Sequence, residues 1–399
     1  MGLRRIWTNI LRGPAVPAEP PGRRSGRGNG NFESGFDEEG TSDVIENSLR
    51  NIVRDKGAVP LTWAAATKVQ HYLNLGDALS PVMVALVSGK PIIHQAHDAL
   101  SVRMAAVGTI AQNMKGGDVS IWGTGSSRYL QTAQEGERVV FRPDPATRYR
   151  VYATRGPVGR AILGEENAVG APVYGDPVWA LPRFYNPKIE KKWEIGVIVH
   201  LSDLTDRALD TLPREAYERY HVPADFKGSV RIINTLTAIS AESMREKLDE
   251  ILACKRLVST SLHGMVFAES YGIPCLYFAP RGTPDGLINR KLDPDDGYDL
   301  RITDLYQGLG RTHLPVYVQR RNKPTDWEHL MWSIDLAWEP VEFDIDPLID
   351  AFPIDVAPIS APAGASIFEH PLIRDIPYAH GGGAAPPKAR VAEAHAVAG

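Results

Sequence analysis

Cysteine is scarce in this sequence, and long hydrophobic runs are missing from it. The 399 residues include two cysteines, Cys254 and Cys275, and neither stands in a Cys-x-x-Cys pair or at metal-ligand spacing from histidines. This pattern argues against a cysteine metal site and favours a reducing cytoplasm. The longest apolar stretch, around residues 81–87, is far shorter than the roughly 20 residues that a membrane-spanning helix needs. We therefore expect no transmembrane segment.

A strong excess of charge of one sign is also absent. The formal net charge is -4 at pH 7, which does not suggest a protein that wraps a nucleic acid. Residues 1–12 are basic but lack the apolar core of a secretory signal, so we expect a cytoplasmic protein. A small-molecule or carbohydrate substrate is the better expectation, without nucleic acid.

The two ends of the chain differ from its middle in composition. Residues 1–44 are rich in Gly, Pro and Arg, and residues 356–399 are rich in Ala, Pro and Gly, so we predict a disordered leader and a disordered tail. The basic residues Arg23, Arg24 and Arg27 of the leader are either solvated or touch anionic lipid. Hydrophobic residues make up 43% of the chain, which is enough apolar material for two hydrophobic cores between the leader and the tail.

Between the tails, short apolar runs alternate with helix-length amphipathic segments, as in parallel sheets joined by crossover helices. We therefore predict an α/β fold with two domains, at residues 45–187 and 188–355. The expected strands are 119–122, 151–153, 172–182, 195–199, 230–233, 257–259 and 275–278. The expected helices are 74–87, 101–114, 241–253, 264–271 and a late one, 326–338, that is placed to pack back across the domain boundary.

The most informative stretch is a buried strand followed by Ser261-Leu262-His263-Gly264 and a helix. This order places His263 at the carboxyl edge of a parallel sheet, where a helix N-terminus offers free amides to a phosphate or carboxylate. A histidine at such an edge can exchange protons near neutral pH. Alternatively, His263 only caps the helix, and the triplet alone does not decide between the two.

Further motifs occur in order along the chain. They are Asn74-Leu75-Gly76-Asp77, Val119 to Gly125, Thr154-Arg155-Gly156-Pro157, Gly175-Asp176-Pro177, and the Leu-His-Gly triplet followed by Phe267-Ala268-Glu269-Ser270 and Gly-Ile-Pro. Together, over about residues 70–310, they resemble the signature of the polysaccharide pyruvyl transferase family. The nearest resemblance is to the succinoglycan-type members of bacterial exopolysaccharide assembly.

This resemblance implies a fold similar to the type B glycosyltransferases, with the ligand in the cleft between two Rossmann-like halves. The implied reaction transfers a pyruvyl group from phosphoenolpyruvate to a sugar of an exopolysaccharide or of its lipid-linked precursor, which forms a pyruvate ketal. The implied partners are phosphoenolpyruvate and that sugar acceptor. We expect no other cofactor, no metal, and a location in the cytoplasm or peripherally at the inner membrane face.

The implied chemistry needs an acid for the enol methylene, a base for the attacking hydroxyl and cations for the phosphate and carboxylate. We assign His263 as the acid and Asp77 as the base, and the two roles remain exchangeable. Alternatively, Asp77 is only a carboxylate that caps the N-terminus of its helix. Arg155 is assigned to the anion, with an inter-domain salt bridge as the alternative. The other predicted substrate-binding residues are Asn74, Gly76, Ser126, Ser261, Leu262 and Gly264.

Two acidic residues of the motifs stay open. Asp176 precedes a proline, and we interpret it as a turn residue rather than as an acid. Glu269 is either functional or the end of a solvated helix face. The acidic run at 293–299 is interpreted as a solvated loop, and His94 and His97 lack an evident third metal ligand.

Ser261 departs from the family pattern. Many members carry Arg directly before Leu-His-Gly, and losing that guanidinium removes a strong charge-assisted contact with the anionic donor. Another cation should replace it, and the nearest in sequence are Lys255, Arg256 and Arg281. Two other functions remain open, which are a nucleotide-sugar glycosyltransferase on the same kind of fold and a non-catalytic carbohydrate-binding or scaffold homologue.

Overall fold

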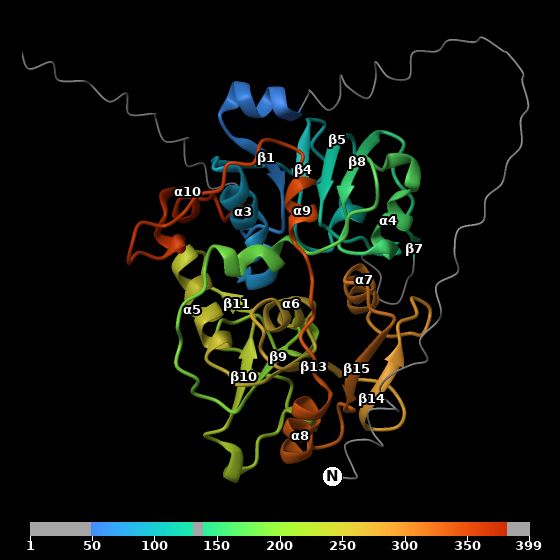
Figure 1. Cartoon of the computed structure of the whole chain (residues 1–399), viewed down its shortest axis with the longest axis vertical. Helices are drawn as coiled ribbons and strands as arrows, with labels where there is room; N and C mark the ends of the chain where they lie inside the picture. Colours follow the sequence, from blue (N-terminus) through green and yellow to red (C-terminus); the bar gives the residue numbers. More distant parts are fainter. Residues whose placement is uncertain (1–48, 131–138, 381–399) are drawn as a thin grey trace, which may run out of the picture.

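The computed structural model of the protein describes residues 49–130 and 139–380. The predicted leader and the end of the predicted tail, residues 381–399, lie outside the described residues. Within the described part, two sheets lie one above the other in Figure 1, and helices surround each of them. The predicted α/β fold with parallel sheets is confirmed, whereas the division into two domains near residue 188 stays a prediction.

The first sheet has five strands among the described residues, in the order β3-β1-β4-β5-β8, and all of its pairings are parallel. In chain order this is the 2-1-3-4-5 arrangement of doubly wound folds. Its central strands are buried throughout or nearly so, as parallel strands covered on both faces require. The strands are β1 Val59–Thr62, β3 Ile92–His94, β4 Arg103–Ala105, β5 Gly117–Trp122 and β8 Thr147–Ala153.

The second sheet follows the order β10-β9-β12-β13-β15-β14 within the described part. Its pairings are parallel except that of β14 with β15. The strand order reverses between β9 and β12, and ligands of doubly wound sheets bind outside the carboxyl ends of strands at such a point. The strands are β9 Ile195–Val199, β10 Val230–Asn234, β12 Leu257–Ser259, β13 Cys275–Ala279, β14 Gly286–Lys291 and β15 His313–Val318.

The helices cover these sheets with apolar faces. In α5, Ser240 caps the N-terminus, and Met244, Leu248 and Ile251 are buried at helical spacing. The central helix α3 is buried along nearly its whole length, because β3, the 3-10 helix Pro177–Arg183, α5 and α10 pack against it. The bounds are α3 Leu75–Ser88, α4 Pro157–Leu163, α5 Ala241–Leu252, α6 Leu262–Ser270, α7 Leu300–Gly308, α8 Trp327–Ala337, α9 Asp346–Asp350 and α10 Pro371–Arg374.

Short elements complete the described chain. A two-stranded antiparallel ladder joins β2 to β11 and so links the beginning of α3 to the second half of the chain. A second ladder joins β6 to β7. The bounds are β2 Leu73–Asn74, β6 Tyr129–Leu130, β7 Val139–Val140, β11 Leu236–Thr237, and the 3-10 helices η1 Ala111–Asn113, η2 Glu165–Asn167, η3 Pro177–Arg183, η4 Leu201–Asp203, η5 Glu218–Tyr220, η6 Ala224–Phe226 and η7 Ile367–Glu369.

The predicted helix at 101–114 is wrong. The segment forms β4 and the short η1, because the apolar run that follows Arg103 fills the position between β1 and β5. The buried Arg103 guanidinium donates to five surrounding backbone carbonyls, which fixes the loops around this strand. A short apolar run does not distinguish a buried strand from a helix by its periodicity.

The predicted strand at 172–182 is also wrong, because its second half is η3. Asp176 accepts a hydrogen bond from the amide of Val178 and so caps this turn. Pro177 and Pro182 cannot donate to a strand ladder, which further disfavours a strand here.

The late helix α8 does not pack back across the predicted boundary. Its buried residues Trp327, Leu330 and Ile334 join the core of the second sheet. The segment that returns to the first sheet follows α8, as Figure 1 shows in orange and red. There the Trp122 indole donates to the carbonyl of Leu348 at 2.7 Å, and Ala357 and Ile359 donate to the end of α3.

The prediction of disorder from residue 356 is wrong for residues 356–380. This stretch forms η7 and α10 and buries Ile367, Phe368, Ile373 and Tyr378 in the largest core cluster. That cluster contains residues of both sheets, so apolar packing is continuous between them. The prediction rested on the overall composition, which is rich in proline and alanine and does not reveal that a few apolar side chains are buried.

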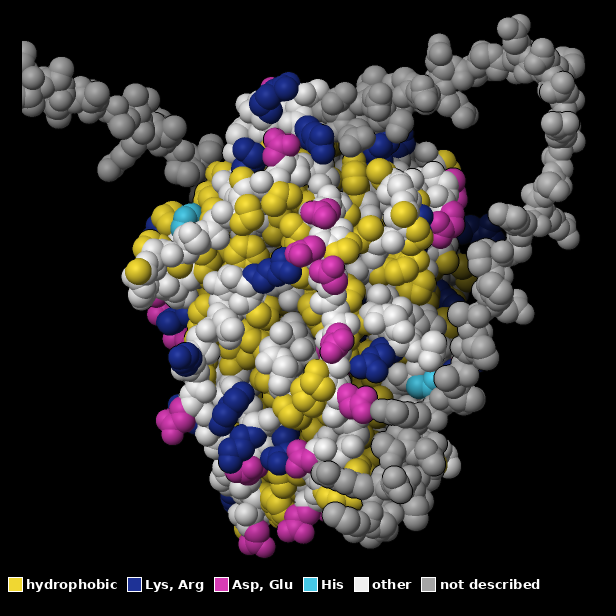
Figure 2. All heavy atoms as spheres, in the orientation of Figure 1, with side chains coloured by type: hydrophobic (Ala, Val, Ile, Leu, Met, Phe, Trp, Pro, Cys, Tyr) yellow, Lys and Arg dark blue, Asp and Glu magenta, His cyan; other side chains and the backbone are white. Residues whose placement is uncertain are grey.

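The face drawn in Figure 2 carries basic and acidic side chains interspersed over its lower part. No helix of the described residues is both long and apolar enough to span a membrane.

Candidate functional site

A cavity of about 510 Å³ lies where the carboxyl ends of strands from both sheets meet. Residues after β4 and β5 line it from the first sheet, and residues after β9, β10 and β12 line it from the second. We call it the inter-sheet cavity. It brings together six of the predicted site residues, namely Asn74, Asp77, Ser126, Ser261, Leu262 and His263.

His263, in the first turn of α6, lies between two carboxylates. Its Nδ1 is 3.9 Å from Oδ1 of Asp77, and its Nε2 is 3.6 Å from Oδ2 of Asp176. Both His263 Nε2 and Asp176 Oδ2 are buried without a hydrogen-bond partner among the described residues. Asp176 therefore caps η3 through one oxygen, as a turn residue does, and faces His263 with the other.

Asp77 is positioned by a short chain of hydrogen bonds. The Asn74 amide donates to Oδ2 of Asp77 at 2.7 Å, and the Thr235 hydroxyl donates to Oδ1 of Asn74 at 2.7 Å. Thr235 belongs to the second half of the chain, next to the ladder between β2 and β11. The carboxylate is thus held by contacts from both halves, and its side chain remains 29% exposed toward the cavity while that of His263 is 7% exposed.

Two of the predicted glycines allow close packing around His263. A Cβ atom at Gly76 would lie 2.1 Å from the His263 ring, so the imidazole can pack against α3 only because this residue is glycine. A Cβ atom at Gly264 would lie 2.1 Å from Oγ of Ser259. Gly76 and Gly264 therefore allow α3 to pack closely against the histidine and α6 to pack closely against the end of β12.

The N-termini of α3 and α6 are directed at the inter-sheet cavity and have no side-chain cap. The side chains of Asn74 and Ser261 accept no hydrogen bond from a backbone amide of the first turn of their helices, whereas Ser240 and Asp326 cap α5 and α8. The amides of an uncapped first turn and the positive end of the helix dipole favour a bound anion. Ser126 contributes a buried hydroxyl oxygen without a partner among the described residues.

Arg155 does not line the inter-sheet cavity. It is buried, and its guanidinium donates to Asp304 at 3.2 Å and to Thr109 at 2.9 Å. Asp304, in α7, also accepts from the amides of Val158 and Gly159 at the start of α4. The geometry is that of the salt bridge between the two halves, which was the alternative to an anion clamp, and the assignment of Arg155 to the substrate anion is not supported.

Arg301 is the cation that the sequence did not indicate. Its guanidinium lines the inter-sheet cavity and is 32% exposed, whereas Lys255 and Arg256 form ion pairs with Glu194 and Asp335 elsewhere. Arg301 follows the acidic run that we interpreted as a solvated loop. The signal in the sequence was Asp299 at the end of this run, a residue type that often precedes a helix, with Arg301 two positions later. In the structure Asp299 caps α7 and pairs with Arg301 at 2.7 Å.

His200, Asp299 and Arg301 form a charged group at the edge of the inter-sheet cavity. Burial would raise the pKa of Asp299, but the charge of Arg301 and its hydrogen bonds outweigh burial and lower that pKa. Burial, followed by the charge of Arg301, lowers the pKa of His200, whose Nε2 lies 3.2 Å from Nη2 of Arg301. At neutral pH, Arg301 therefore supplies the positive charge of this group and His200 is neutral.

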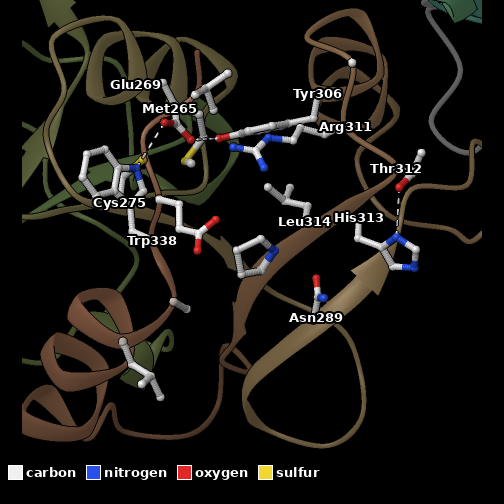
Figure 3. A pocket seen from close by; sticks show the side chains of 16 residues that line it. Met265, Glu269, Cys275, Asn289, Tyr306, Arg311, Thr312, His313, Leu314 and Trp338 are labelled. Carbon is white, nitrogen blue, oxygen red and sulfur yellow. Dashed lines mark hydrogen bonds between the residues drawn. The ribbon is translucent and has the colours of Figure 1, made fainter. Parts of the chain in front are cut away.

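Glu269 lies in a different cavity, of about 480 Å³, at the amino ends of β13 and β15 (Figure 3). Tyr306 and Trp338 donate to its two carboxylate oxygens at 2.7 and 3.1 Å. Burial raises the pKa of this carboxyl. Since both oxygens are engaged, Glu269 joins α6 to α7 and to the segment after α8, and it neither contacts the inter-sheet cavity nor ends a solvated face.

The described residues contain no group of three or more His, Cys, Asp or Glu side chains arranged to hold a metal ion.

Comparison with known proteins adds to this geometry. Residues 146–282 match the family model described as polysaccharide pyruvyl transferase. An uncharacterized protein of Acanthamoeba polyphaga mimivirus is 30% identical to the chain over 124 residues, which are 31% of this chain and 36% of the relative. The chain thus spans little more than a third of the length of that curated relative. The family match covers Arg155, Asp176 and His263, whereas Asn74 and Asp77 precede it.

The resemblance of the chain to the polysaccharide pyruvyl transferase family is thereby confirmed, over the residues that carry its Arg-Gly-Pro, Gly-Asp-Pro and Leu-His-Gly motifs.

Proposed function

We propose that the protein transfers the pyruvyl group of phosphoenolpyruvate to two hydroxyls of one sugar and releases phosphate. The observation that carries this proposal is the position of His263, from the family's Leu-His-Gly motif, between Asp77 and Asp176 at the inter-sheet cavity. The family match supports the same reaction class.

The proposed reaction balances without an oxidant or a reductant. The methylene carbon of phosphoenolpyruvate gains a proton, and a sugar oxygen forms a bond to the neighbouring carbon. The second sugar oxygen then forms a bond to the same carbon, while the bond between this carbon and the phosphate oxygen breaks. Of the two hydroxyl protons, one replaces the proton delivered to the methylene and the other leaves with phosphate, which gives a cyclic ketal with one carboxylate.

His263 suits the role of the acid. Its Nε2 faces the buried Asp176, and its Nδ1 faces Asp77 and the cavity. A carboxylate at one ring nitrogen stabilises the imidazolium and fixes the ring, so the proton exchanged with substrate is the one on the other nitrogen. We therefore assign proton delivery to Nδ1 of His263, with Asp176 as the positioning residue.

Asp77 suits the role of the base. The amide of Asn74 engages its Oδ2, which leaves Oδ1 directed toward His263 and the cavity. A carboxylate fixed in this way can accept the proton of a sugar hydroxyl while His263 protonates the methylene. The proximity of the two groups also allows the proton to return to the histidine after each turnover.

The donor's negative charges need cations, and we infer that Arg301 takes the place of the family arginine that Ser261 replaces. Arg301 lines the same cavity as Ser261 and is held in position by Asp299. The uncapped first turn of α6 supplies amides on the same side. These groups meet the requirement for phosphate and carboxylate contacts that Arg155 does not meet.

The acceptor belongs to the finer part of the proposal. We propose a sugar of an exopolysaccharide or of its lipid-linked precursor, reached at the cytoplasmic face of the inner membrane, because the family acts on polysaccharides. Deleting residues 1–40 tests a peripheral association through the basic leader. An unchanged membrane-bound fraction after this deletion contradicts that association.

Calorimetric titration of the purified chain with phosphoenolpyruvate and, separately, with a nucleotide diphosphate sugar tests the donor. We expect phosphoenolpyruvate to bind to the wild type. Arg301→Ala should lower the affinity for phosphoenolpyruvate by about tenfold or more, because a charge-assisted contact is lost. Arg374→Ala is the matched control, since Arg374 is exposed and pairs with Asp375. Binding of the nucleotide diphosphate sugar alone would instead favour the glycosyltransferase.

A further inference from the structure

A second, smaller cavity of about 280 Å³ adjoins the inter-sheet cavity. It lies at the carboxyl ends of β9, β12, β13 and β15, close to the point where the strand order of the second sheet reverses. Doubly wound sheets bind ligands at this position. We call it the arginine cavity, and its lining residues include His200, Asp203, Thr260, Tyr277, Arg281, Asp299, Arg301 and Arg321.

We propose that the arginine cavity is a phosphate-binding subsite whose occupant reaches into the inter-sheet cavity. Only the identity of the phosphate ester, as donor or acceptor, rests on the proposed function. The two cavities share His200, Asp299 and Arg301, so a phosphate on one side of this group lies next to a reacting centre on the other.

The charge of the lining favours an anion. Of the described side chains that line it, Arg281, Arg301 and Arg321 stand against Asp203 and Asp299. Each aspartate is already paired, Asp299 with Arg301 at 2.7 Å and Asp203 with Arg321 at 2.9 Å. The lining therefore retains an excess of positive charge, and arginine forks match the oxygens of a phosphate.

Arg281 is the cation available for a ligand. It is exposed at the end of β13 and has neither an ion pair nor a hydrogen bond to any residue that the structure describes. Arg320, by contrast, lies at the end of the neighbouring strand β15, outside this cavity, and pairs with Asp285 at 2.8 Å. These two arginines form a matched pair for experiments.

A buried guanidinium behind the cavity adds to the positive potential. Arg219 is fully buried, stacks 3.9 Å from the centre of the Phe278 ring and donates to the Phe278 carbonyl at 2.7 Å. Its Nε and Nη1 have no partner among the described residues. Burial lowers its pKa, whereas the charges of the nearby Tyr220 and Asp203 act to raise it.

Titration of the full chain with inorganic phosphate and with pyrophosphate, at low salt, tests the subsite independently of turnover. We expect Arg281→Ala to weaken binding by about tenfold or more, because a contact between charged groups is lost, while Arg281→Lys retains part of the affinity. Arg320→Ala should leave the affinity unchanged. Equal affinities for wild type and Arg281→Ala, or no binding of either anion by the wild type, would overturn the proposal.

The same variants identify the source of the phosphate. If Arg281→Ala weakens the binding of phosphoenolpyruvate, the subsite holds the donor's phosphate. If it weakens the binding of uridine diphosphate glucose and not that of phosphoenolpyruvate, the subsite holds the diphosphate of a sugar ligand. If pyrophosphate binding depends on Arg281 while phosphoenolpyruvate does not bind at all, the subsite stands and the proposed pyruvyl transfer fails.

Discussion

The inter-sheet cavity and the arginine cavity share one charged group but differ in what surrounds it. The first places an imidazole between two carboxylates, and the second gathers arginines around paired aspartates. The first is built from both sheets, whereas the second takes its lining from the second sheet and the loops that follow its strands. The imidazole and most of the arginines thus lie in different cavities, and His200, Asp299 and Arg301 line both.

This difference has a mechanical consequence. The inter-sheet cavity depends on how the two halves are held together, through Asn74 and Thr235 and through Arg155 and Asp304. The described residues that line the arginine cavity all lie between His200 and Arg321, in the second half of the chain, although Arg301 shares α7 with Asp304. Changes that loosen the halves should therefore impair the first cavity much more than the second.

The largest expected effect is on stability, at the salt bridge between Arg155 and Asp304. Asp304→Ala should lower the free energy of unfolding by about 3–5 kcal/mol, because it leaves a buried guanidinium unpaired. The loss for the double variant Arg155→Met/Asp304→Leu should be well below the sum of the two single losses. Denaturant unfolding measures the cycle, and strictly additive losses would show that the bridge does not join the halves.

Removal of the His263 imidazole should impair the chemistry of the inter-sheet cavity and leave anion binding in the arginine cavity unchanged. His263→Ala should reduce turnover by at least about 100-fold, the usual contribution of a general acid. Pyrophosphate affinity should stay within about twofold of wild type, because the arginine cavity lacks His263. Phosphate release and calorimetry measure the two quantities, and the exposed His71 provides the control, His71→Ala.

Should both quantities fall together in His263→Ala, the two cavities would form one binding unit and the separation would be wrong.

Asp176→Asn sharpens the distinction between positioning and catalysis. The amide retains the shape of the carboxylate but withdraws a negative charge from Nε2 of His263, so we expect turnover to fall by about tenfold, as for a lost contact to a charged group. The alkaline limb of the pH profile, where the general acid loses its proton, should move to lower pH, because a negative charge beside the protonated ring has been removed. An unchanged pH profile would mean that Asp176 acts only as the cap of η3.

The smallest effect concerns protons taken up on binding. Burial and Arg301 lower the pKa of His200. An anion in the arginine cavity offsets the charge of Arg301, so it should raise this pKa, and binding near pH 6 should take up a fraction of a proton. Sulfate is a suitable probe because it does not titrate in this range. Calorimetry in buffers of different ionisation enthalpy measures the uptake, which His200→Gln should remove.

Sulfate binding to the wild type without proton uptake would place the anion away from His200.

The sequence revealed much of the fold and part of the site. Strongly apolar runs such as Ile195–Val199 identified the parallel strands, and the motifs placed Asp77 and His263, which the fold brings within 3.9 Å. Arg301 was not found, because its role depends on a loop folding back over the carboxyl edge of the sheet. Local sequence also left open whether Arg155 binds an anion or Asp304, since that depends on a residue 149 positions away.

The proposed pyruvyl transfer is tested most directly by titrating phosphoenolpyruvate into the wild type, Arg301→Ala and the control Arg374→Ala. We predict binding to the wild type and to the control, and binding that is weaker by about tenfold or more in Arg301→Ala. No binding of phosphoenolpyruvate to the wild type, together with binding of a nucleotide diphosphate sugar, would contradict it.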